Sequence, residues 1–133
     1  MQEFQHRQYF EEMMDMSVEA HNIRLYDLAL NLAKKAYDIA PQDSTYKGRA
    51  ARDISARYDR LGWEYIDEAE VFAEEAYRIH DHLVQTKPDR EAYRQRSVSA
   101  MYLAVNGLRR AIKNGESSED NNADVEILAF IQL

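Results

Sequence analysis

Apolar side chains recur at every third or fourth position over most of this chain, which is the spacing of one face of an α-helix. The pattern predicts five helices, at about residues 3–22, 26–40, 45–61, 67–85 and 90–114. Ser44 and Asp89 stand where the third and fifth helices need an N-cap. Pro41, Gly62 and Gly115 follow three of the helices and predict where they stop, because proline and glycine interrupt helical backbone. The sequence therefore predicts an all-α domain.

The chain changes character after residue 115. Residues 116–122 are polar and acidic, which is typical of a flexible linker, and residues 123–133 are short and mostly apolar. So short an apolar stretch does not stay ordered alone. We expect it to pack on this domain, to pack on a neighbouring copy as in a homodimer, or to begin a longer element. The predicted organisation is a helical repeat domain over 1–115 and an acidic linker with an apolar segment over 116–133.

Two of the predicted helices are related in sequence. Residues 25–40 align without a gap to residues 65–80, and the shared residues include three alanines with the spacing A-x3-A-x2-A. Small side chains at these positions let a neighbouring helix approach closely, with axes near the short end of the usual range of about 8–10 Å. The repeat therefore predicts helix pairs that stack into one continuous core. The repeated alanines are Ala29, Ala33 and Ala36 in the first copy and Ala69, Ala73 and Ala76 in the second.

This pattern resembles the tetratricopeptide repeat, a helix–turn–helix unit whose second helix has an aromatic residue near its start, small residues within it and a proline after its end. The copies here lie further apart than that family's usual period of about 34 residues, and its tryptophan-containing signature is not intact. The resemblance implies antiparallel helix pairs stacked as a right-handed superhelix. An ordinary helical bundle that contains a repeat is the alternative. The matching residues of the first unit are Tyr26, Ala29, Ala36 and Pro41.

Composition argues against several classes of function. The net charge of −7 argues against a nucleic-acid partner, because phosphate binding needs a basic surface. No apolar run approaches the ~18 residues that cross a bilayer, and residues 1–8 lack the apolar core of a signal peptide, so we expect no membrane partner. The chain has no cysteine, which excludes disulfides and thiolate chemistry and is compatible with a cytoplasmic location.

Patterns of catalytic and metal-binding residues are also missing from the sequence. Glu3 and His6 form one Glu-x-x-His, whereas a di-iron bundle needs two such pairs and two further glutamates. The sequence contains no glycine-rich phosphate loop and no Ser/His/Asp set. We therefore predict that the chain is not an enzyme and needs no cofactor or metal.

Charge is distributed unevenly along the chain. Basic side chains outnumber acidic ones in residues 43–61 and 89–114, and acidic ones prevail in residues 64–81. Because the first helix of each tetratricopeptide pair lines a concave groove, the resemblance implies a basic groove over an acidic back, suited to an acidic peptide. Solvated surface charge is the alternative interpretation. The residues predicted to contact a partner are Arg49, Arg52, Arg57, Tyr58, Arg60 and Arg94.

The leading hypothesis is thus a scaffold for protein–protein interaction that binds a peptide or a protein in a helical groove. The alternative is a structural unit that assembles with itself, in which residues 123–133 pack into a neighbouring copy. Removal of that segment separates the two, because only self-assembly would lose its oligomer.

Overall fold

The computed structural model describes residues 5–115, and in this range every regular element is helical, which confirms the predicted all-α class. The predicted linker and apolar segment at 116–133 lie outside the described residues. The first helix begins at Arg7, later than the sequence predicts, and the other boundaries fall close to the predicted ones. The helices are α1 (Arg7–Asn22), α2 (Tyr26–Ile39), α3 (Thr45–Leu61), α4 (Ile66–Thr86) and α5 (Arg90–Lys113), with a short 3-10 turn, η1 (Trp63–Tyr65), before α4.

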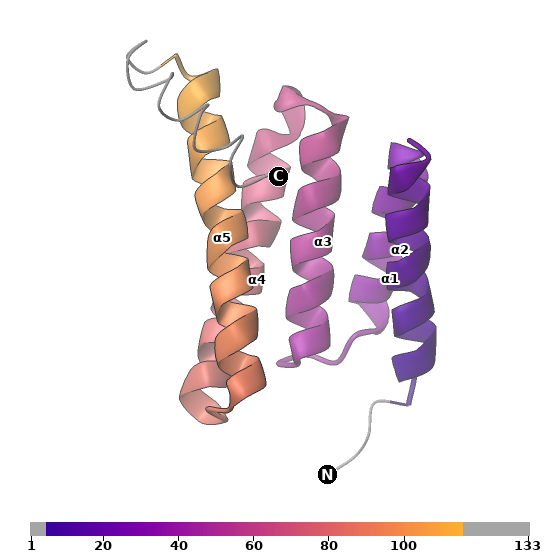
Figure 1. The fold of residues 1–133 in the computed structure, drawn as a ribbon, viewed down its shortest axis with the longest axis vertical. Helices are drawn as coiled ribbons and strands as arrows, with labels where there is room; N and C mark the ends of the chain where they lie inside the picture. Colours follow the sequence, from indigo (N-terminus) through magenta and orange to yellow (C-terminus); the bar gives the residue numbers. More distant parts are fainter. Residues whose placement is uncertain (1–4, 116–133) are drawn as a thin grey trace.

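The helices form two layers (Figure 1). Helices α1, α3 and α5 lie side by side and run in the same direction, and α2 and α4 lie behind them and run in the opposite direction. Each helix packs against the next one along the chain, and α3 also contacts α5. None of the helices within residues 5–115 is long and apolar enough to cross a membrane.

Local sequence signals set the helix boundaries as predicted. The Ser44 hydroxyl accepts a hydrogen bond from the backbone N–H of Lys47 at 3.1 Å, and the Asp89 carboxylate accepts one from Ala92 at 2.7 Å. Both bonds satisfy amide groups that the first turn of a helix leaves without partners. Gly62 ends α3 with φ of 140°, a conformation that favours glycine.

The repeated alanines lie in the core, as the sequence predicts. In α2, Ala29, Ala33 and Ala36 are fully buried, and so are Ala69, Ala73 and Ala76 in α4. Their small size lets the two layers lie close together. The closest approach of this kind is at Gly48 of α3. A methyl group added there would lie 2.2 Å from Nε2 of the buried His80 on α4. The close packing of these helices therefore depends on residues without large side chains.

A pair of equivalent hydrogen bonds shows that the helix pairs repeat in space. The Ser17 hydroxyl on α1 donates to the Ala29 carbonyl on α2 at 2.9 Å, and the Ser55 hydroxyl on α3 donates to the Ala69 carbonyl on α4 at 2.7 Å. Each serine also accepts a hydrogen bond from the next helix of its own layer. The donors are Arg57 to Ser17 and Asn106 to Ser55, both at 3.1 Å. Helices α1, α3 and α5 thus occupy successive equivalent places.

Candidate functional site

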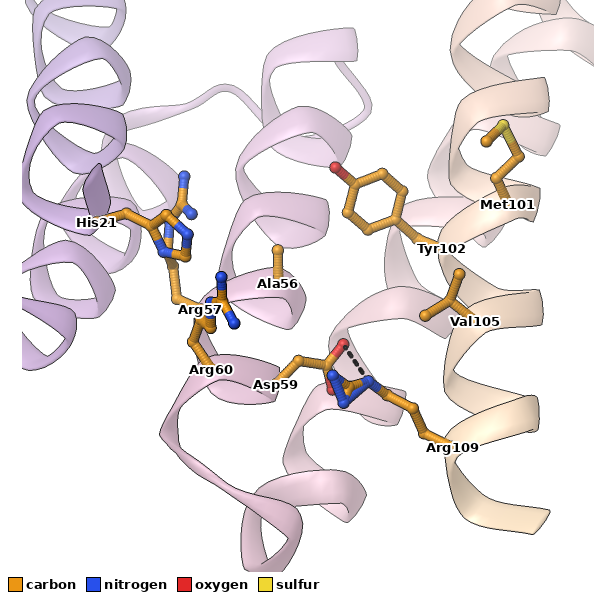
Figure 2. Close-up of a pocket in the computed structure, with 9 residues that line it drawn as sticks. All are labelled: His21, Ala56, Arg57, Asp59, Arg60, Met101, Tyr102, Val105 and Arg109. Atoms are coloured by element: carbon orange, nitrogen blue, oxygen red, sulfur yellow. Dashed lines mark ion pairs between the residues drawn. The ribbon is translucent and has the colours of Figure 1, made fainter. Parts of the chain in front are cut away.

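The face formed by α1, α3 and α5 carries a pocket of about 520 Å³, near the C-terminal ends of α1 and α3 and beside residues 101–109 of α5 (Figure 2). Helix C-termini carry partial negative charge, so basic side chains are favoured in their last turns. Here His21 is in the last turn of α1 and Arg60 is in the last turn of α3. Figure 2 shows His21 on one side of the pocket, the α3 side chains in the middle and the α5 side chains opposite. The pocket is lined by His21, Ala56, Arg57, Asp59, Arg60, Met101, Tyr102, Val105 and Arg109.

Arg57 is held inside the protein rather than offered to a ligand. Only 7% of the residue is exposed, and its guanidinium contacts Asp53 Oδ1 at 2.7 Å and donates to the Ser17 hydroxyl. Burial raises the pKa of Asp53, and the positive charge of Arg57 opposes that rise. A paired and buried charge of this kind is costly to break, because either partner alone would be left uncompensated. Arg57 therefore fixes the spacing of α1 and α3 and forms one wall of the pocket.

Arg109 and Asp59 form a loose pair on the opposite wall. Arg109 Nε lies 3.8 Å from Asp59 Oδ2, beyond hydrogen-bond distance, and this buried nitrogen has no hydrogen-bond partner among residues 5–115. The guanidinium also lies over the Trp63 ring, at 5.3 Å from its centroid. Burial raises the pKa of Asp59 to about 6, and Arg109 lowers it only in part. Asp59 therefore holds the Arg109 guanidinium only loosely, and an anionic group in the pocket could compete for its positive charge.

Arg60 is the exposed cation of the pocket. Within residues 5–115 no carboxylate lies within ion-pair distance of its guanidinium, which is 6.0 Å from the Tyr26 ring centroid. His21 stands nearby with its Nδ1 buried and without a hydrogen-bond partner in that range. Burial lowers the pKa of His21, and the positive charges of Arg57 and Arg60 lower it further. The histidine is thus neutral at neutral pH, and the charge of this wall comes from Arg60.

The other predicted arginines lie away from the pocket. Arg49 makes a two-pronged contact with Glu11 of α1, at 2.8 and 3.2 Å. Arg52 lies over the Tyr102 ring and has no ion pair within the described range, and burial lowers its pKa. Arg94 pairs with Glu91 one turn earlier in α5. Of the predicted arginines, only Arg57 and Arg60 line the pocket, and Arg49 and Arg52 lie nearer the start of α3.

Tyr58 does not line the pocket. Its ring stacks on Tyr65 and on Phe72 of α4, with centroids 5.8 and 6.1 Å away. It belongs to the aromatic packing between the layers, although it follows Arg57 directly in the sequence. One residue along a helix turns a side chain by about 100°, so neighbours in sequence face different surroundings. Sequence reasoning missed the contributions of His21, Asp59, Tyr102 and Arg109, because they come from three separate helices.

A second hollow, of about 860 Å³, lies at the opposite end of the molecule. It is bounded by the segments that connect α2 to α3 and α4 to α5 and by the start of α1. Its charged groups are the cations Arg7 and Lys87 and the carboxylates Asp43, Asp89 and Glu91. The carboxylates repel an acidic ligand, and Asp89 already caps α5. This hollow is less suited to an acidic partner than the pocket between α1, α3 and α5.

Comparison with known proteins identifies no relative. No family model, no curated protein and no solved structure matches this chain. Within residues 5–115 no group of three or more histidine, aspartate and glutamate side chains could hold a metal ion.

Proposed function

We propose that this chain is a non-catalytic binding module of tetratricopeptide-like architecture, and that the pocket between α1, α3 and α5 holds an acidic side chain or terminal carboxylate of a protein partner. One observation carries the proposal. Arg60 and Arg109 line the same pocket, and within residues 5–115 Arg60 has no ion pair and Arg109 has only the 3.8 Å contact to Asp59. Carboxylates are the natural partners of such donors, because guanidinium groups bind them with directed hydrogen bonds.

The rest of the pocket supports a peptide rather than a free anion. Met101 and Val105 of α5 supply an apolar wall, and the ring of Tyr102 extends from the same helix toward the middle of the pocket (Figure 2). A volume of about 520 Å³ falls within the range of about 300–1,000 Å³ that is usual for ligand sites. An acidic residue would meet the arginines while an apolar neighbour in the same peptide covers Met101 and Val105.

The tetratricopeptide-like architecture is supported by the repeating contacts between the layers. Buried alanines, a serine-to-carbonyl bond within each pair and a donor from the next helix of the layer recur in both units. In such an array the first helices of successive pairs share one face, and α1, α3 and α5 stand in that relation (Figure 1). The proposed site lies on that shared face.

Fluorescent peptides that carry one to three aspartates or glutamates, each matched with its asparagine or glutamine analogue, test the proposal. We expect acidic peptides to bind the full chain more tightly than their neutral analogues, and binding to weaken as salt rises. Arg60→Gln should weaken binding about tenfold or more, as expected for a charge-assisted hydrogen bond of about 1.5–3 kcal/mol. Arg78→Gln on α4 is the matched control, because its side chain is largely exposed on the other layer.

Two outcomes would contradict the proposal. Equal binding of acidic and neutral peptides would show that the arginines play no part in recognition. Equal loss of affinity in Arg60→Gln and Arg78→Gln would show that overall charge, and not the pocket, attracts the peptide. Circular dichroism of both variants should match that of the unmodified chain, because each side chain lies at the surface and makes no buried contact.

A further inference from the structure

On the side of α5 that faces away from the pocket, no helix within residues 5–115 packs, although the matching sides of α1 and α3 are covered by the helices that follow them. Arg57 of α3 and Asn106 of α5 make the same bond to the preceding helix of their layer, so the two residues hold equivalent positions. Counting back equally from each residue pairs three positions of α3 with three of α5. Gly48, Ala51 and Ser55 correspond to Ser97, Ala100 and Ala104.

On α3 these three positions face α4. Gly48 and Ala51 are buried, and the ring of His80 stands against Gly48. Ser55, also buried, donates its hydrogen bond to the Ala69 carbonyl of α4. On α1, Ser17 makes the same bond to α2. In both pairs, therefore, this side of the helix is covered by the helix that follows it directly in the chain.

On α5 the same three positions are exposed. A methyl group added at Gly107, on the same side of α5, would meet no atom within 4 Å among residues 5–115. Small residues in a row on a helix are suited to the close approach of a second helix, and the glycine among them, Gly107, costs helix stability in water. This side of α5 has the form of a packing surface, and nothing in residues 5–115 covers it.

The chain itself carries an apolar segment of suitable length directly after α5. Residues 123–133 have the sequence ADVEILAFIQL and, as an α-helix, would extend about 16 Å. That length matches the stretch of α5 from Ala100 to Ala111. The connection at 114–122 can reach about 30 Å when extended, which is ample for the chain to turn back. Its acidic residues suit a solvent-exposed turn.

We propose that residues 123–133 pack as a sixth helix, antiparallel to α5, on the side that carries Ser97, Ala100 and Ala104. The segment would cover α5 in the same way that α2 covers α1 and α4 covers α3. Its own chain is the favoured occupant, because a short linker holds it near α5 at an effective concentration in the millimolar range. Pocket residues such as Val105 and Arg109 project from another side of α5, so this packing leaves the proposed ligand site open.

The absence of cysteine from the chain allows a direct test by disulfide formation. The full-length double variant Ala104→Cys with Leu128→Cys, oxidised mildly in dilute solution, should form a disulfide within one molecule. The matched control pairs Leu128→Cys with Val71→Cys, since Val71 is 59% exposed on α4. We expect the Ala104 pair to form its bond at least about tenfold faster than the control, as an intramolecular reaction allows. Ile127→Cys and Ile131→Cys, each with Ala104→Cys, cover neighbouring registers.

Hydrogen exchange of the full chain gives an independent readout. Amides of residues 123–133 should exchange at least about tenfold more slowly than in an unstructured chain, and Ala104→Glu should abolish that protection while Val71→Glu preserves it. Disulfides that join two molecules would overturn the proposal in favour of exchange between copies. Equal rates for the Ala104 and Val71 pairs, or unprotected amides in the unmodified chain, would overturn it outright.

Discussion

Gly48→Ala should destabilise the protein, although replacing glycine by alanine within a helix normally stabilises it by about 1 kcal/mol. The added methyl carbon would lie 2.2, 2.5 and 2.8 Å from Nε2, Cε1 and Cδ2 of His80. Ordinary contacts between such atoms begin near 3.4 Å. The imidazole ring, or the whole of α3, must therefore move by about 1 Å to accommodate the methyl group.

The ring has little freedom to move. His80 is fully buried, its Nδ1 lies 2.6 Å from the Ser99 hydroxyl, and its Nε2 lies 3.4 Å from the Thr45 carbonyl. Overpacking of a core costs about 1–3 kcal/mol, and loss of the Ser99 hydrogen bond in a buried site costs a similar amount. After the gain in helix propensity is subtracted, we expect a net loss of about 2 kcal/mol in the free energy of unfolding.

A double-mutant cycle isolates the contact. In a His80→Ala background the methyl group has room, so Gly48→Ala should stabilise by about 1 kcal/mol and the coupling energy should be about 3 kcal/mol. Urea unfolding followed by circular dichroism measures all four proteins. If Gly48→Ala were neutral or stabilising in the otherwise unmodified chain, the close approach of α3 to the His80 ring would be refuted.

Three further predictions concern titration and a hydrogen bond between the layers. Burial lowers the pKa of His80 from 6.5 to about 4, so the folded state binds fewer protons than the unfolded chain between these values. The contribution of neutral His80 to the free energy of unfolding is complete above pH 6.5. It should fall by about 2 kcal/mol, allowing for partial solvent screening, as the pH drops to about 4. Urea titrations of His80→Gln should not show this loss. The pKa of Asp59, raised from 3.8 to about 6, acts in the opposite direction: its contribution is complete below pH 3.8 and is lost as the pH rises to about 6, and Asp59→Asn should abolish that decline. Tyr37→Phe removes the 2.6 Å hydrogen bond to Glu75 and should lower the free energy of unfolding by about 1 kcal/mol. Burial and this hydrogen bond raise the pKa of Tyr37 to about 12. In an alkaline titration, the absorbance change of its phenolate should therefore appear only above the pH range of ordinary tyrosines. An unchanged urea unfolding midpoint in Tyr37→Phe would contradict a stabilising role for that hydrogen bond.

The fold could be predicted as far as it depends on local sequence. Ser44, Asp89 and Gly62 act within one turn of their helix ends, and the periodic alanines report one helix face, so both signals are readable without tertiary knowledge. The superhelical arrangement stays a prediction, since sequence periodicity fixes which face is buried but not the angle between neighbouring pairs.

The site was less predictable because it depends on contacts between distant residues. Arg49 meets Glu11 across two helices of the same layer, and Arg110 meets Asp67 and Glu70 of α4. Counting charge along the chain treats all of these arginines alike. The pair of Arg57 with Asp53 is an exception, because a spacing of four residues along a helix is visible in sequence and signals an internal ion pair.

Net charge is therefore a poor guide to where this protein would bind a partner, and a cation without an ion pair is a better guide. Two arginines of α5 form ion pairs with the acidic helix α4. Arg96 pairs with Asp81, and Arg110 pairs with two carboxylates. Reversing Arg96 would break a contact between layers and lower stability, whereas reversing Arg60 breaks no ion pair within residues 5–115. A ligand that responds to Arg60 but not to Arg96 in folded variants would be recognising the geometry of the pocket, because the two substitutions change the total charge equally.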